Sequence, residues 1–189
     1  MRFLKFIVLA ILLAALASCG GPFTRVTKPE YTSSGQSYKV NLPVGWVQAT
    51  GPQAGEALWI SKDGYSLQSF RIDALKQEKA FITLKKSADT KMAISDLAEL
   101  ELAEFKAKNP NAASVKVLEN TLSKVSDQKA YRLHLQYLND KGLRFEQVTY
   151  GFVSPKFYYK LAYQAPTLHY FKRDLPAFNQ VVNSFKLTE

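Results

Sequence analysis

The sequence predicts an α+β fold in which an antiparallel β-sheet is flanked by helices. The second half of the chain contains four segments that alternate apolar and polar side chains, and short polar turns separate them. Two other stretches repeat apolar residues at helical spacing. Strands and helices are therefore segregated along the chain, which favours α+β over a parallel α/β arrangement. We find no internal repeat, so we expect a single domain.

The first predicted strands lie between residues 38 and 72. Residues 38–42 alternate apolar with polar side chains, as a half-buried strand does. Residues 58–61 and 67–72 are expected to form a second pair of strands on either side of Lys62-Asp63-Gly64, which favours a hairpin turn. The first half is therefore expected to form a strand and a hairpin.

A helix is expected after this hairpin, with Ser95 as its N-cap and residues 109–111 as its stop. Glu99, Glu101 and Glu104 are expected to point to solvent. Glu101 and Glu104 share one face of the helix, a pattern that paired catalytic carboxylates could also give, but we favour solvated helix charges. The apolar face at helical spacing consists of Ile94, Leu97, Ala98, Leu102 and Phe105.

The remaining chain is predicted to be a four-strand meander that ends in a helix. The strands are expected over residues 115–122, 131–137, 144–153 and 157–165, with short turns between neighbours. Asp174 is a plausible cap for the closing helix, because Pro176 then falls in its first turn. The apolar stripe that should pack on the sheet consists of Leu175, Phe178, Val181, Val182 and Phe185.

The N-terminus has the three parts of a secretory signal peptide. Basic residues stand at positions 2 and 5, residues 6–16 are apolar without interruption, and small residues follow. The cleavage region, Leu16-Ala17-Ser18-Cys19, resembles the lipobox of bacterial lipoproteins. Cys19 is the only cysteine of the chain. This resemblance implies cleavage after residue 18 and a lipid anchor on Cys19, through which the protein would bind a membrane.

The domain organisation expected from these features has three parts. Residues 1–18 form the cleaved signal peptide, residues 19–36 form a lipidated tether rich in glycine, proline and serine, and residues 37–189 form the domain. Gly20 and Gly21 follow the cysteine without an aspartate. In lipoproteins of Gram-negative bacteria this implies transfer to the outer membrane, so we expect a location on that membrane facing the periplasm.

The formal net charge of +9 makes the chain basic. Nucleic acid is not an expected partner, because the chain is predicted to be exported. Most lysines are dispersed, as on an ordinary solvated surface. A sharper possibility is attraction to anionic lipid, peptidoglycan or an acidic protein, and the residues that favour it are Lys76, Lys79, Lys85, Lys86 and Lys91.

The histidine, serine and cysteine residues do not form a recognisable catalytic or metal-binding pattern. His134 and His169 have no second histidine at ligand spacing, and no G-x-S-x-G segment is present. Cys19 is assigned to the lipid. We therefore expect no enzyme, no cofactor and no metal. An envelope hydrolase would require one of these histidines to meet a serine and a carboxylate in space.

Aromatic residues crowd the C-terminal third and are the candidate binding residues. Tyr158 and Tyr159 are neighbours on a predicted strand, so their side chains must point to opposite faces. Aromatic side chains are common in strands and also in binding surfaces, and core packing is the simpler interpretation. If a groove for a protein or ligand exists here, the residues expected in it are Tyr158, Tyr159, Tyr163 and Tyr170.

Two segments resemble PsbP-like domains. Residues 38–46 run from a strand into a proline-x-glycine-tryptophan turn, and residues 158–163 precede a helix that ends at residues 181–185. That family, which includes bacterial lipoproteins related to DcrB, has an antiparallel sheet flanked by helices. The resemblance implies a non-enzymatic binding or accessory module for an envelope protein assembly. The alternative is a carrier or sensor of a small hydrophobic ligand.

Overall fold

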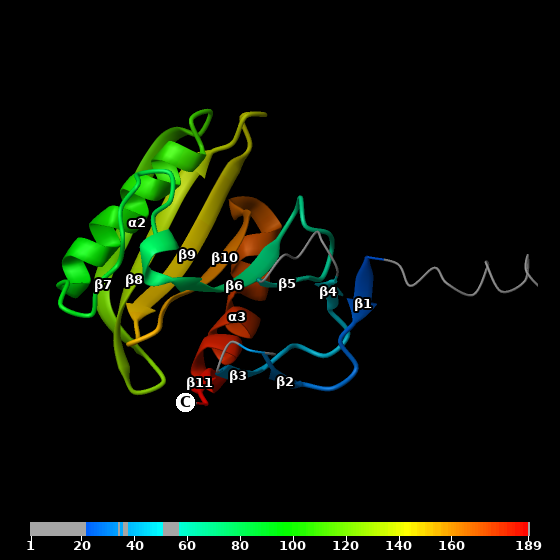
Figure 1. The fold of residues 1–189 in the computed structure, drawn as a ribbon. Coiled ribbons are helices and arrows are strands. Elements are labelled where there is room, and N and C mark those ends of the chain that lie inside the picture. Colours follow the sequence, from blue (N-terminus) through cyan, green and yellow to red (C-terminus); the bar gives the residue numbers. More distant parts are fainter. Residues whose placement is uncertain (1–21, 34, 36–37, 51–56, 189) are drawn as a thin grey trace, which may run out of the picture.

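The computed structural model describes residues 22–33, 35, 38–50 and 57–188 (Figure 1). The predicted signal peptide and Cys19 lie outside these residues, so their assignment remains a prediction. None of the helices in the described part is long and apolar enough to cross a membrane.

Within the described residues the strands form a large and a small antiparallel sheet. The large sheet has the order β1-β4-β5-β6-β10-β9-β8-β7, and the small one the order β11-β3-β2. The large-sheet strands are β1 (Phe23–Arg25), β4 (Val47–Ala49), β5 (Leu58–Ser61), β6 (Ser69–Lys76), β7 (Ala113–Val125), β8 (Gln128–Leu138), β9 (Arg144–Val153) and β10 (Phe157–Pro166). The small sheet consists of β2 (Glu30–Thr32), β3 (Tyr38–Asn41) and β11 (Lys186–Leu187).

The two main helices cover opposite faces of the large sheet (Figure 1). Helix α3 (Lys172–Ser184) and the small sheet pack on one face, around Tyr159, Phe178 and Phe185. Helix α2 (Ile94–Lys108) packs on the other face, over β8 and β9, around Tyr131 and Leu133. This arrangement confirms the predicted α+β fold with a C-terminal meander flanked by helices.

Three local predictions need correction. Helix α2 begins at Ile94 with Ala93 at its N-cap and without a side-chain cap, so Ser95 lies inside the helix. Asp174 lies in the first turn of α3, which has Phe171 at its N-cap. Strands β1 and β2 fall inside residues 19–36, which were assigned to the tether, and they pair with β4 and β3. A tripeptide can join a sheet by backbone hydrogen bonds alone, without an apolar pattern that a sequence reading could detect.

A close approach between neighbouring strands depends on one glycine. Gly151 of β9 stands opposite Tyr131 of β8, and the buried ring of Tyr131 lies directly over it. A Cβ atom at position 151 would lie 2.4 Å from Cζ and Oη of that ring. The absence of a side chain at position 151 therefore makes room for the Tyr131 ring.

The hairpin β5–β6 and the C-terminal meander meet along a single pair of strands. Strand β6 pairs with β10 over its whole length, and this pairing places Asp73 opposite Lys160. The β6–β10 pairing therefore brings together charged residues that lie far apart in the sequence.

Candidate functional site

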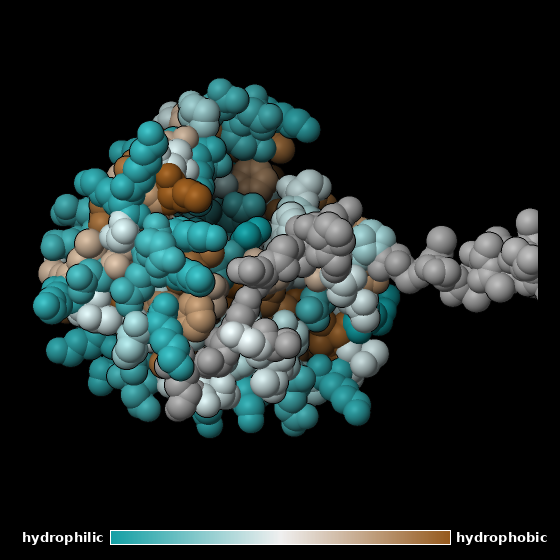
Figure 2. All heavy atoms as spheres, in the orientation of Figure 1, coloured by the Kyte–Doolittle hydropathy of each residue, from teal (hydrophilic) through white to brown (hydrophobic). Residues whose placement is uncertain are grey.

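A groove of about 520 Å³ opens beside α2, on the face of the sheet that α2 covers only in part. We call it the α2 groove. Its floor comes from β5, β6, β9 and β10, and its walls come from α2 and the loop after β6. The lining includes Trp59, Ser69, Arg71, Asp73, Lys79, Ile82, Glu101, Glu104, Lys108, Asn109, Gln147, Lys160 and Gln164. In Figure 2 hydrophilic residues cover most of the visible face, and apolar residues show between them.

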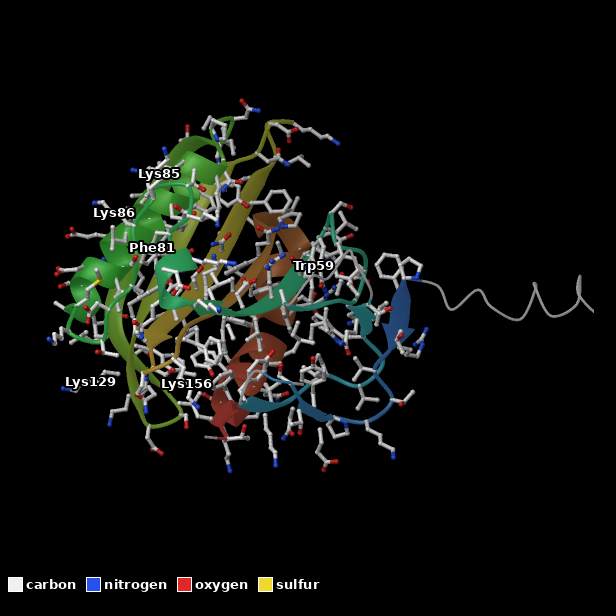
Figure 3. All side chains as sticks on the ribbon, in the orientation of Figure 1. Trp59, Phe81, Lys85, Lys86, Lys129 and Lys156 are labelled. Atoms are coloured by element: carbon white, nitrogen blue, oxygen red, sulfur yellow. The ribbon has the colours of Figure 1, made fainter. Side chains whose placement is uncertain are left out.

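Strand alternation explains why polar residues line this floor. On β6, Phe70 and Ile72 point into the core under α3, so Arg71 and Asp73 point to the opposite face. On β10, Tyr159 and Leu161 belong to the same core, which leaves Lys160 on the groove side. Figure 3 shows Trp59 on the β5 side, well apart from Phe81, Lys85 and Lys86 on the side of α2.

The centre of the floor is a buried ion pair connected to two tyrosines. The Nζ atom of Lys160 lies 3.5 Å from Oε1 of Glu101. The Tyr158 hydroxyl donates a hydrogen bond of 3.3 Å to Oε2 of Glu101. It lies 2.6 Å from the hydroxyl of Tyr131, which then acts as the donor in that second hydrogen bond. These contacts fix the Glu101 carboxylate in one position beneath the groove.

Burial governs how this pair binds protons. Burial raises the pKa of Glu101, and the nearby Lys160 and Lys108 only partly offset this effect. Burial acts to lower the pKa of Lys160, but the carboxylates of Glu101 and Asp73 outweigh it and raise that pKa above its ordinary value. Lys160 is therefore charged at neutral pH, and it provides a fixed positive charge in the floor.

Glu104 fixes the loop that forms one wall of the groove. Its carboxylate accepts hydrogen bonds of 3.1 Å from the backbone N–H groups of Thr83 and Leu84, and it pairs with Lys108 at 3.1 Å. Burial acts to raise the pKa of Glu104, but these contacts outweigh it, so the pKa lies below its ordinary value. The prediction that Glu101 and Glu104 point to solvent is therefore wrong, since they are only 3% and 1% exposed.

Replacing Glu104 with glutamine is expected to lower the free energy of unfolding by about 1–3 kcal/mol. The two backbone N–H groups use different oxygens of the carboxylate, and glutamine replaces one of these oxygens with an NH2 group that cannot accept, so one N–H group loses its partner. Urea denaturation measures the loss, and Glu99→Gln, an exposed change on the same helix, is the matched control. Equal stability of the two variants would contradict this role for Glu104.

The stabilising effect of Glu104 should depend on pH. Because its pKa is lower in the folded state than in the unfolded state, the stabilisation is present above the ordinary pKa of 4.5 and is lost as the pH falls through the folded-state value. The difference in stability between wild type and Glu104→Gln should therefore shrink in acid.

The charges of the groove are arranged in two levels. The buried Asp73 accepts from Arg71, whose side chain is 45% exposed, and Arg71 also lies 5.8 Å from the centre of the Trp59 ring. Lys108 is 41% exposed above the buried Glu104. The carboxylates thus lie beneath the surface, and the cations are presented at the mouth.

The histidines lie outside this groove. His134 contacts Glu146 at 2.8 Å and stacks on Phe171, on the side of the sheet that faces α3. His169 is exposed in the turn before α3, next to the ring of Tyr170. Among the described residues no group of three or more metal-ligating side chains is present.

The four tyrosines proposed for binding are mostly core residues. Tyr158 and Tyr159 point to opposite faces as predicted, and each is fully buried under a helix. Tyr163 is also buried, and its hydroxyl donates to the backbone carbonyls of Tyr170 and Phe171. Tyr170 is half-buried and lies under the guanidinium of Arg173. The first three therefore present no surface to a partner in this structure, and Tyr158 acts beneath the groove through Glu101.

Sequence reasoning missed Arg71, Asp73 and Lys160 as groove residues. Lys160 is the residue that the sequence could have pointed to, because it is a charged residue in the middle of a strand rich in aromatic side chains. Such a lysine needs a partner on its own face. Its partner Glu101 comes from a distant helix, and no local pattern connects the two.

Comparison with solved structures places the fold among known ones. The solution structure of cyanobacterial PsbP (CyanoP) from Synechocystis sp. PCC 6803 has a TM-score of 0.59 and 14% identity, and the match covers 92% of this chain and 99% of that one. A point mutant of the protein Mog1 has a TM-score of 0.57 and 10% identity, and the match covers 86% of this chain and 96% of that one. A crystal structure from Bacteroides thetaiotaomicron VPI-5482 has a TM-score of 0.53 and 14% identity, and the match covers 87% of this chain but only 50% of that one.

At these identities the solved structures show the fold alone. A search among curated proteins found no match. The family model described as PsbP matches residues 28–187, which is most of the chain and includes every strand and helix of the α2 groove. The chain therefore belongs to the PsbP family.

Proposed function

We propose that the protein is a lipid-anchored, periplasm-facing lipoprotein that acts as a non-enzymatic binding or accessory module for an envelope protein assembly. The α2 groove is its docking site. The observation that carries the proposal is the floor of this groove, in which the Glu101 side chain is already held by Lys160 and Tyr158. Around it the side chains of Arg71, Lys108 and Ile82 are exposed in large part. A floor that is already ordered loses little entropy on binding.

Further observations support this function. Membership of the PsbP family favours an accessory role, and the lipobox resemblance at Cys19 favours an anchor, on the outer membrane in a Gram-negative host. Strand β1 and helix α2 lie at opposite ends of the molecule (Figure 1). A chain anchored before β1 would therefore hold α2 away from the membrane. The charged lining suits a protein partner better than a small hydrophobic ligand.

Site-specific photo-crosslinking in membranes tests the docking site. A crosslinker in place of Ile82, which lies at the groove and is 61% exposed, is expected to capture one envelope protein in stoichiometric yield. The matched control is Leu122, which is 78% exposed on β7 outside the groove. Absence of an adduct from position 82, or equal adducts from both positions, would count against the proposal.

The anchor is tested on the full-length chain by intact mass and membrane fractionation. The wild type is expected to carry lipid and to sediment with membranes, because several acyl chains on one residue make release slow. Cys19→Ala should lack the lipid and leave the membrane fraction. An unmodified wild type would show that Cys19 is not an anchor.

A further inference from the structure

We propose that the α2 groove binds an extended acidic peptide segment of the partner. This inference rests on the proposed function and specifies the chemistry of the docking partner. Its basis is the unequal exposure of the two signs of charge in the groove.

The charge that a ligand meets at the mouth is positive. Asp73, Glu101 and Glu104 are buried, and each already has a cation or backbone N–H groups as partners. The side chains of Arg71 and Lys108 are 45% and 41% exposed, and Lys79 is exposed in the wall. Because each carboxylate beneath the surface is shielded, a carboxylate of the ligand can approach these cations at little cost in repulsion.

The cations are spread along the groove instead of converging on one point. Arg71 comes from β6, Lys79 from the turn η2 (Gln77–Lys79), Lys108 from the end of α2 and Lys160 from β10. Arg71, Lys108 and Lys160 are each paired with a different carboxylate, and these pairings keep the three cations apart. A small anion would reach only part of this set, whereas a chain with several carboxylates along its length can contact it all.

The other lining groups match a polypeptide. The carboxamide of Gln147 donates to Thr149 at 3.0 Å, and that of Asn109 donates to the carbonyl of Phe105 at 2.8 Å. The oxygen of each carboxamide can therefore accept from other donors, such as the N–H groups of a peptide backbone. Trp59 in the floor and Ile82 in the wall offer apolar contacts. The combination suits a segment in which acidic residues alternate with apolar ones.

Binding is measured by titrating the full chain in non-ionic detergent with a terminally blocked peptide of alternating Glu and Leu. Trp59 lies in the groove and Trp46 is buried in the core under α3, so Trp59 fluorescence reports occupancy. The signal should disappear in Trp59→Phe. The same peptide with Gln in place of Glu should not bind, and salt should weaken the binding of the acidic peptide.

Two lysines on α2 give a matched pair of variants. Lys108→Gln removes a cation at the mouth, and Lys106→Gln removes an exposed charge two positions earlier that is not part of the lining. The first should weaken binding about two- to fivefold, the effect of one exposed ion pair, and the second should leave it unchanged. Because Lys108 also pairs with the buried Glu104, thermal melts of both variants are recorded, and binding is compared at a temperature at which both are folded.

Three outcomes would overturn the inference. They are equal binding of the Gln and Glu peptides, equal behaviour of the two lysine variants, and displacement of the peptide by succinate at equal carboxylate concentration, which would identify a small-anion site. If the crosslinker at Ile82 captures a partner that the acidic peptide does not displace, the docking function stands and only the acidic segment is wrong. If no partner is captured anywhere, the proposed function itself fails.

Discussion

Replacing Gly151 with alanine is expected to lower the free energy of unfolding by about 3 kcal/mol or more, since an added methyl group overpacks a filled core. The new Cβ atom would lie 2.4 Å from the Tyr131 ring. That ring is buried, and its hydroxyl is tied to Tyr158, so it cannot move aside without breaking a buried hydrogen bond. Chemical denaturation of the two proteins measures the difference.

Two other variants separate this clash from a general intolerance of alanine. Gly142 has open space around it but a positive φ of 73°, so Gly142→Ala should cost about 1 kcal/mol through backbone strain alone. In a double-mutant cycle, Tyr131→Ala should remove most of the cost of Gly151→Ala, because the atoms that clash are gone. Additive effects of the two changes would disprove the explanation.

Breaking the buried pair in the groove floor is expected to have an effect of similar size. Lys160→Met keeps the length of the side chain but leaves the Glu101 carboxylate without its cation. The loss of stability should be about 3 kcal/mol, which is the cost of an uncompensated buried charge and not the value of the pair itself. Calorimetry or urea denaturation at neutral pH measures it.

The double variant Glu101→Gln with Lys160→Met shows whether this loss of stability comes from the unpaired carboxylate or from altered packing. It removes both charges, so its stability should return close to that of wild type. If it is as unstable as Lys160→Met alone, the loss comes from packing and not from the unpaired carboxylate.

The contribution of Glu101 to stability should depend on pH in the opposite direction to that of Glu104. Because burial raises the pKa of Glu101 in the folded state, its stabilising contribution is complete below the ordinary value of 4.5 and is lost as the pH rises through the folded-state value. The stability of wild type relative to Glu101→Gln should therefore fall as the pH rises above the ordinary value of 4.5. A difference that grows over this range would contradict the raised pKa.

The meander could be predicted from the sequence because local patterns determine it. Tyr131, Leu133, Leu135 and Tyr137 alternate along one strand, and turn residues separate that strand from its neighbours in sequence. The resemblance to PsbP-like domains rested on the same kind of local pattern, and the family match confirms it.

The groove could not be predicted, because it depends on pairing between distant segments. Glu101 and Glu104 have the spacing of solvated helix charges, and only their contacts with β10 and with the loop after β6 show that they are buried. Arg71 becomes part of a site only when β6 pairs with β10. For the same reason, the sequence pattern of aromatic residues on β10 fits a binding surface as well as a core, whereas in the structure these rings fill two cores.

The β6–β10 pairing also bears on the order of events in folding. Strands β7 to β10 follow one another through short turns, whereas β6 and β10 close a long loop, and we expect this pairing to form after the local hairpins. Hydrogen exchange of the β6 and β10 amides in refolding experiments would show that delay. Asp73 and Lys160 face each other across this pairing, so the floor of the groove arises only in that late step. A ligand that spans the groove floor can therefore bind only the fully folded chain. Because it binds the folded state and not the unfolded state, such a ligand stabilises the β6–β10 pairing.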